Sequence, residues 1–179
     1  MSTRSSRASS PRRELPRAGA FAPVADARTR VLILGSLPGT ASLAAGQYYA
    51  HPRNDFWRLV GAVTGVELAA LPYRARLAAL LGAGVGLWDV IASARRRGSL
   101  DAAIREAETA DLATLAARLP ALRAVAFNGA KAAALGRRRL AEVPRLVLID
   151  LPSSSPAHAR PLAAKLAAWR ALGPHLAGG

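Results

Sequence analysis

Residues 48–57 (YYAHPRNDFW) gather aromatic, imidazole and amide side chains just before an apolar helical pattern. A hydrophobic core can use Phe56, but it has no need of Tyr49, His51 and Asn54 together in one loop. Polar density of this kind in a loop usually serves binding or catalysis. The Tyr49 ring can stack on a flat ligand, and the His51 imidazole and the Asn54 amide can hydrogen-bond to a ligand or to water. The alternative for Asn54 alone is a structural role, because Asn is favoured at helix N-caps.

A second polar segment, residues 150–161 (DLPSSSPAHARP), places three serines between prolines and follows them with a histidine and an arginine. Ser, His and Asp occur together here, but too few residues separate them for the geometry of a serine hydrolase. A rigid loop of hydroxyl groups followed by basic side chains instead suits contacts to DNA phosphates and entry into a groove. The candidate DNA-binding residues are Ser153, Ser154, Ser155, Ala157, His158 and Arg160.

A third segment, residues 35–40 (GSLPGT), carries two glycines that allow a sharp turn and a close approach of backbone N–H groups to a ligand. It lacks the Gly-Lys-Ser/Thr of a phosphate-binding loop, the G-x-G-x-x-G of a dinucleotide site and the G-x-S-x-G of a hydrolase. A nucleotide-processing enzyme is therefore a poor fit. Taken alone, the segment is typical of an ordinary turn between a strand and a helix.

These segments need elements that bring them together. Four short, continuous apolar runs predict strands covered on both faces, at residues 31–34, 85–88, 124–127 and 146–149. Helical patterns occur at residues 54–63, 73–81, 100–108, 112–119, 131–140 and 161–172. Strands that alternate with helices predict an α/β protein, a three-layer α/β/α fold with a central four-stranded parallel sheet. Ligands of such sheets bind beyond the carboxyl ends of the strands, where the glycine turn and the serine-rich segment lie.

Composition limits the classes of protein. The chain has 179 residues, of which 51% are hydrophobic, and these can form one sizeable core. No apolar run reaches the roughly 20 residues that span a bilayer. The absence of cysteine excludes disulfides, cysteine-bound zinc and a thiol nucleophile. The net charge of +14 favours a polyanion such as nucleic acid as partner. The alternative is that an arginine- and alanine-rich composition reflects only a high-GC genome.

The chain divides by composition into three parts. Residues 1–30 are rich in Ser, Arg and Pro, so we expect a disordered basic arm. Such an arm can contact phosphates, or it can be a solvated tail without function; it lacks the apolar stretch of a secretory signal. Residues 31–173 form the expected folded domain, and residues 174–179 form a tail.

Taken together, these motifs resemble the uracil-DNA glycosylase superfamily, and most closely its DNA-deoxyinosine (hypoxanthine-DNA) glycosylase branch. The resemblance lies in G-S-x-P-G at residues 35–39, Q-Y-Y-A-H-P-x-N-x-F-W at 47–57, L-W-D-V at 87–90, G-S-L-D at 98–101, F-N-G at 127–129 and L-P-S-S-S-P-A at 151–157. It extends over residues 31–172 and implies a uracil-DNA glycosylase-like fold.

The resemblance also implies a reaction. A nucleotide is flipped out of the stack, and water attacks C1′ of its sugar to release the base. Two positions that often activate the water in the superfamily are apolar here, namely Leu37 in the first motif and Leu151 at the start of the last one. The deoxyinosine branch implies that Asn54 holds the water instead. We do not expect a lysine Schiff base, because Lys131 and Lys165 lie outside the site segments.

For base recognition, the resemblance implies that Tyr49 stacks on the flipped base and that the backbone around Ser36 meets its polar edge. Asp89 can accept the N1–H of hypoxanthine or the N3–H of uracil, which adenine and cytosine lack; capping of the turn after a strand is its alternative role. The expected base-binding residues are Gly35, Ser36, Leu37, Tyr49, His51 and Asp89.

We therefore predict a monofunctional DNA glycosylase of base-excision repair that removes deaminated bases. Hypoxanthine is the expected base, with uracil an open second one. The alternative is a catalytically weak or inactive DNA-binding protein of the same fold that recognises unusual bases. We expect DNA with deaminated bases as the partner, no metal or other cofactor, no membrane association, a monomeric state, and a place in the bacterial cytoplasm at the nucleoid.

Overall fold

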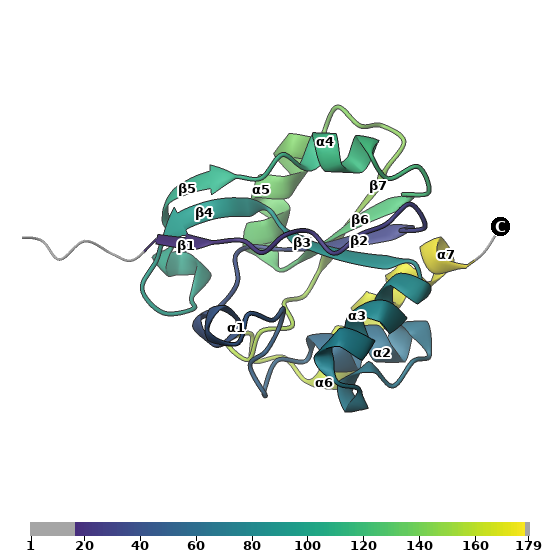
Figure 1. Ribbon diagram of the computed structural model, residues 1–179, viewed down its shortest axis with the longest axis horizontal. Coiled ribbons are helices and arrows are strands. Elements are labelled where there is room, and N and C mark those ends of the chain that lie inside the picture. Colours follow the sequence, from purple (N-terminus) through teal and green to yellow (C-terminus); the bar gives the residue numbers. More distant parts are fainter. Residues whose placement is uncertain (1–16, 178–179) are drawn as a thin grey trace, which may run out of the picture.

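The computed structural model describes residues 17–177, and its centre is a four-stranded parallel sheet (Figure 1). The strands are β2 (Val31–Gly35), β3 (Val85–Asp89), β6 (Ala124–Asn128) and β7 (Val147–Leu151), in the order β3-β2-β6-β7. Each coincides with one of the four predicted apolar runs. The register places Gly35 beside Asp89 and Asn128 beside Leu151, so the carboxyl ends of all four strands meet at one edge.

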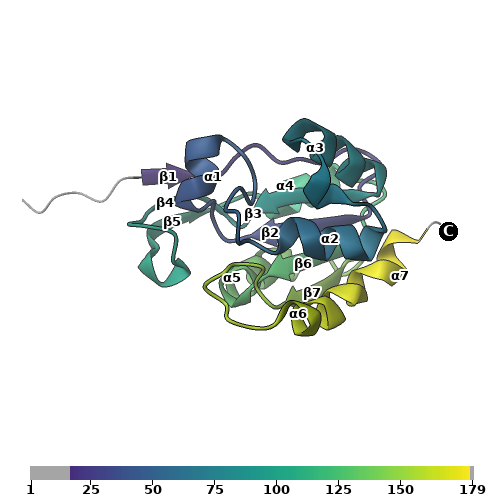
Figure 2. The same cartoon turned by 90° about the horizontal axis from the view of Figure 1, so that it is seen from below.

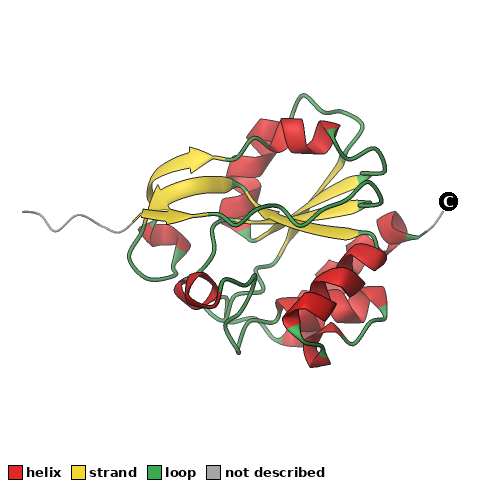
Figure 3. Ribbon diagram, viewed as in Figure 1, coloured by secondary structure: helices red, strands yellow, loops and turns green. Residues whose placement is uncertain are grey.

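Helices cover both faces of this sheet, which confirms the predicted three-layer architecture (Figure 3). One face carries α2 (Phe56–Thr64), α3 (Tyr73–Gly82), α6 (Leu162–Trp169) and α7 (Gly173–Leu176). The other carries α4 (Leu112–Ala117) and α5 (Ala130–Leu140). Short helices complete the fold: α1 (Thr40–Ala45), η1 (Leu68–Ala70) and η3 (Arg170–Leu172), the last forming the end of the helix predicted for residues 161–172.

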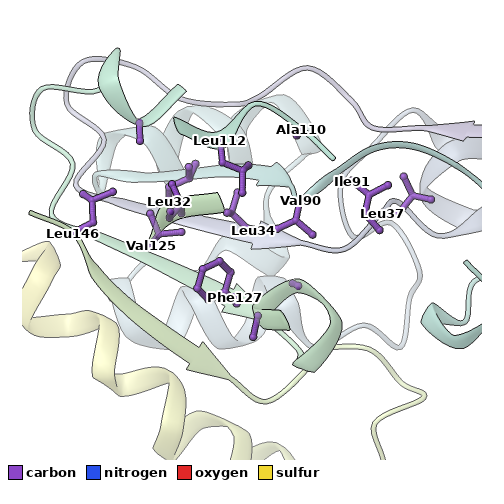
Figure 4. Close-up of a cluster of buried hydrophobic side chains, with 14 of the residues drawn as sticks. Leu32, Leu34, Leu37, Val90, Ile91, Ala110, Leu112, Val125, Phe127 and Leu146 are labelled. Atoms are coloured by element: carbon purple, nitrogen blue, oxygen red, sulfur yellow. The ribbon is translucent and has the colours of Figure 1, made fainter. Parts of the chain in front are cut away.

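Because side chains alternate between the two faces of the strands, the sheet has a hydrophobic core on each face. Leu32 and Leu34 of β2 point to the same face as Val125 and Phe127 of β6, and they pack with residues of α4 and α5 (Figure 4). The residues between them, such as Ile33, face α2, α3 and α6. Burial on both faces is the reason that these strands appear in the sequence as unbroken apolar runs.

A second, antiparallel sheet contradicts one helix prediction. It consists of β1 (Arg17–Gly19), β4 (Ile91–Arg95) and β5 (Arg105–Thr109), in the order β1-β4-β5. The helix expected at residues 100–108 is wrong, because this stretch forms only the short η2 (Asp101–Ala103) before β5 begins. Its Arg, Glu and Ala residues favour a helix locally, but pairing with β4 and ion pairs such as Arg95–Glu106 (2.8 Å) override that preference.

The folded domain also begins earlier than the expected boundary at residue 31. Strand β1 pairs with β4, and Val24 exchanges backbone hydrogen bonds of 2.9 and 2.8 Å with Leu87 of β3. The Trp88 indole donates to the Phe21 carbonyl at 3.0 Å. Residues 17–30 are therefore part of the domain and not of a disordered arm. The rest of the expected arm, residues 1–16, and residues 178–179 of the tail lie outside the described residues.

Candidate active site

A cavity of about 700 Å³ lies at the carboxyl ends of the strands, a size within the range of small-molecule pockets. The loops after β2, β4, β6 and β7 contribute to its wall. Twelve of the residues predicted from the sequence line it: Gly35, Ser36, Leu37, Tyr49, His51, Asn54, Asp89, Ser153, Ser154, Ser155, Ala157 and His158. Arg160 is exposed and does not line the cavity.

The loop before α2 presents an aromatic ring and an amide to this cavity. The ring of Tyr49 stacks on Phe56 with centroids 3.7 Å apart and an interplanar angle of 8°, so one of its faces is covered. The Oδ1 of Asn54 accepts the Phe56 N–H at 3.0 Å, which forms an Asx-turn just before α2. The N-cap of this helix is Asp55, so the N-cap role expected as the alternative for Asn54 is wrong. Among residues 17–177, the Asn54 Nδ2 makes no further hydrogen bond. The turn and a role in the cavity are thus compatible.

His51 is held in one tautomer by the backbone of the same loop. Its Nδ1 accepts the Arg53 N–H at 3.1 Å, so the proton of the neutral ring resides on Nε2. His51 lines the cavity and is half-buried. Its ring can therefore offer a hydrogen-bond donor to a ligand.

Asp89 is a buried carboxyl group at the end of β3. It is 3% exposed, and within the described part of the chain its Oδ2 has no hydrogen-bond partner. Burial raises the pKa of Asp89 to about 7, where the nearby Arg96 opposes the shift and Asp101 contributes to it. Its side chain makes no hydrogen bond to residues 17–177, so the turn-capping alternative is wrong.

Gly35 makes room for Asp89 and for the Tyr49 hydroxyl. A Cβ at Gly35 would lie 2.6 Å from Asp89 Oδ1 and 3.1 Å from the Tyr49 oxygen. Any larger residue at this position would therefore displace both groups. Burial, with the nearby Asp89 adding to it, also raises the pKa of the Tyr49 hydroxyl, which keeps it neutral.

The serine-rich loop is fixed by a residue that carried no predicted role. Asn128, at the end of β6, donates from Nδ2 to Ser154 Oγ and accepts the Ser154 N–H at Oδ1, both at 2.8 Å. Ser154 is fully buried, so the phosphate contact expected of it is wrong, and its hydroxyl serves to position the loop. Ser153 and Ser155 are partly exposed and remain candidates for phosphate contacts.

A buried ion pair joins this loop to the start of α2. Lys165 of α6 is 1% exposed and donates to Asp55 Oδ2 at 2.9 Å and to the Ser155 carbonyl at 3.4 Å. The Asp55 N–H donates to the Ser154 carbonyl at 3.0 Å. These contacts hold the loop next to the Asn54 segment and keep Lys165 out of the cavity lining.

Lys131 contradicts the expectation that both lysines lie outside the site. It lies in the first turn of α5 and lines the cavity, although it belongs to none of the motifs. It forms no ion pair within residues 17–177. The sequence did not reveal that Lys131 lines the cavity, because its side chain reaches the cavity from the first turn of a helix and lies in no recognisable motif. The other residues that sequence reasoning missed, Asp101 and Asn128, lie in matched motifs but carried no chemical assignment.

Two further findings concern the described residues only. No three His, Asp or Glu side chains within residues 17–177 converge as metal ligands would. No helix of that part of the chain has the length and apolar character to cross a membrane.

Fold and cavity together define an α/β protein with a ligand-sized cavity at the carboxyl ends of a parallel sheet. The sequence profile of the Uracil DNA glycosylase superfamily matches residues 22–173. The chain belongs to this superfamily, and it is a DNA N-glycosylase.

Relatives and a solved structure agree with this assignment. The chain is 46% identical over 111 residues to a hypoxanthine DNA glycosylase of Methanosarcina barkeri, covering 62% of this chain and 70% of that protein. It is 45% identical over 112 residues to a hypoxanthine DNA glycosylase of Methanosarcina acetivorans, covering 63% and 71%. The solution structure of a protein titled a putative uracil DNA glycosylase from M. acetivorans superimposes with a TM-score of 0.80 at 38% identity, covering 90% of this chain and 99% of that one.

Proposed function

We propose that this glycosylase removes hypoxanthine from deoxyinosine in DNA by water attack on C1′ of a flipped nucleotide. The observation that carries the proposal is the cavity, which combines the Tyr49 ring with the unpartnered Asp89 carboxyl. The names of the two Methanosarcina relatives point to the same base. We further propose that the protein works as a monomer on nucleoid DNA of a bacterial cell.

Base recognition follows from the groups on the cavity wall. The ring of Tyr49 has one face against Phe56, and its opposite face can stack on the base. Asp89 can accept the N1–H of hypoxanthine, and while it is protonated it can also donate to O6. Uracil presents the same pair of groups, a carbonyl beside an N–H, so we propose it as a second substrate.

Asn54 positions the water in this mechanism. Its Oδ1 is held by the Phe56 N–H at 3.0 Å, which fixes the direction of the amide. An amide is a weak base, so the rate would come mainly from positioning and from electrostatic stabilisation of the separating charges. We propose that the ammonium group of Lys131 contacts a phosphate of the flipped nucleotide, because it faces the cavity without a carboxylate partner among the described residues.

The test is excision from a short duplex that contains a single deoxyinosine, followed by alkali to cleave abasic sites. A parallel duplex with a single deoxyuridine measures the second base. A protein that binds both duplexes and cleaves neither would contradict the proposal. The same reaction with borohydride distinguishes the nucleophile, since only attack by an amine such as that of Lys131 leaves protein covalently bound to DNA.

Substitution of His158 tests whether the serine-rich loop enters the duplex. We expect His158→Ala to weaken binding to a duplex more than it lowers excision from a single strand, since a single strand has no stack to open. The side chain lines the cavity, and in the described structure its buried Nε2 has no partner. Equal losses on both substrates would place His158 in the chemical step instead.

A further inference from the structure

Arg96 is a charged residue that is buried against the turn after β2. It directly follows β4 and is 4% exposed. Its guanidinium donates to the Leu37 carbonyl at 3.4 Å and to the Pro38 carbonyl. Within residues 17–177 it forms no ion pair, and its buried Nε has no hydrogen-bond partner. Burying an arginine without a carboxylate in contact costs free energy, which indicates that its charge serves the cavity beside it.

Two carboxyl groups of the cavity lie within reach of the charge of Arg96. Asp89 ends β3 and Asp101 begins η2, and both line the cavity. Arg96 lowers the pKa of Asp89 and Asp101 raises it, in addition to the larger rise that burial causes. The Tyr48 and Tyr49 hydroxyls also lie near Asp89, but burial raises their pKa and keeps them neutral. Among residues 17–177, the charges that act on Asp89 are therefore those of Arg96 and Asp101.

The same two residues also hold the turn after β2. Asp101 accepts the Ser36 hydroxyl at 2.5 Å, and Arg96 binds the carbonyls of the next two residues. Ser99 adds a third contact, since its Oγ accepts the Thr40 N–H at 2.8 Å. Figure 2 shows α1, which follows the turn, at the same end of the molecule as the connection between β4 and β5. The side chains of this connection therefore set the position of the turn along the cavity wall.

We propose that Arg96 and Asp101 are positioning residues of base excision, which place the turn after β2 against the base and together control whether the Asp89 carboxyl carries a charge. The inference rests on the proposed function, because it assumes a base in this part of the cavity. In the proposed reaction, neutral Asp89 donates to O6 of the base. Asp101 favours the neutral form and Arg96 opposes it, so the balance of the two charges sets the pH range of excision. Neither residue has to touch the base for this effect.

The test measures single-turnover excision from a deoxyinosine duplex between pH 5 and pH 9, with the protein at saturating concentration. Asp101→Asn keeps an acceptor for the Ser36 hydroxyl but removes the negative charge, so the fall in rate with rising pH should move to lower pH by about one unit. Arg96→Gln keeps an amide donor but removes the positive charge, so the fall should move to higher pH by a similar amount. Opposite displacements would not arise if the two residues only stabilised the fold.

Two further variants separate the charge of Arg96 from its contacts with the turn. Arg96→Lys keeps the charge but loses the planar pair of donors to the Leu37 and Pro38 carbonyls. Its pH profile should match that of the parent protein, while its rate falls about tenfold because the turn is less well placed. Arg97→Gln is the matched control, since Arg97 is exposed and the loss of its charge should leave the pH profile unchanged. If Arg96→Gln does not fold, the displacement in Asp101→Asn decides.

A titration of the DNA-free protein separates this inference from the proposed function. The NMR signal of the Asp89 carboxyl carbon, identified by its loss in Asp89→Asn, reports the protonation of this group directly. We expect it to titrate at lower pH in Asp101→Asn and at higher pH in Arg96→Gln than in the parent protein. These displacements in a protein that excises no base would overturn the proposed function and keep the control of Asp89 by the two charges. Excision by a parent protein whose titration and rate profile are shared by both variants would overturn this inference.

Discussion

Asn54→Ala is expected to lower single-turnover excision of hypoxanthine on the order of 10²-fold or more, the scale seen when one preorganised group is lost. The affinity for DNA should change little, because in the proposed mechanism the amide acts mainly in the transition state. The same substitution removes the acceptor of the Phe56 N–H and should cost about 1 kcal/mol of stability. Measuring the thermal midpoint and the excision rate on one sample records both effects.

Asn54→Ser separates the two roles of this residue. A serine hydroxyl can also accept the N–H two residues on, so this variant should keep most of the stability of the parent protein. Its shorter side chain does not extend as far into the cavity, and we expect excision to remain as low as in Asn54→Ala. A serine variant that excises at the parent rate would show that Asn54 acts only in the turn before α2.

Asp89→Leu is expected to lower excision by about 10²-fold, since it removes the group that we propose contacts the base where negative charge develops. It should at the same time raise the free energy of unfolding, because the parent protein buries a carboxyl whose Oδ2 has no partner among the described residues. Opposite changes in activity and stability are the signature of a buried group kept for function. A loss of both would indicate a structural role.

The pH dependence of Asp89 follows from its burial. Its pKa of about 7 lies above its ordinary value of 3.8, so the folded state binds the proton more tightly than the unfolded chain does. The free energy of unfolding should fall as pH rises from about 4 to 7 and stay lower above that range. Thermal midpoints of the parent protein and of Asp89→Asn, measured at pH 5 and pH 8, check this, since only the parent should lose stability through this group.

The rate of excision should depend on the same proton. Neutral Asp89 can donate to O6 of the departing base, whereas the ionised group repels the charge that develops there. Excision by the parent protein should therefore fall as pH rises through about 7, the value set by burial. Asp89→Asn keeps an acceptor and a donor without a titrating proton, and its rate should be flat across this range. A parent profile that rises with pH would contradict the neutral-carboxyl mechanism.

Local sequence was sufficient for the central sheet and for most of the cavity wall. Strands buried on both faces must be continuously apolar, so runs such as VLIL at residues 31–34 identify them without knowledge of their partners. The carboxyl ends of parallel strands meet at one edge, so this topology brings the polar segments after β2 and β7 close together. That argument is independent of side-chain detail.

Tertiary structure decided what depends on a partner distant in sequence. Residues 105–109 favour a helix by composition, but β4 supplies the hydrogen bonds of a strand. Ser154 is removed from solvent by Asn128, 26 residues away, and Lys131 reaches the cavity through the turn of α5. The raised pKa of Asp89 exists only because folding excludes water from its carboxyl group. Burial, pairing and the direction of a side chain are properties of the assembled fold, so no local pattern contains them.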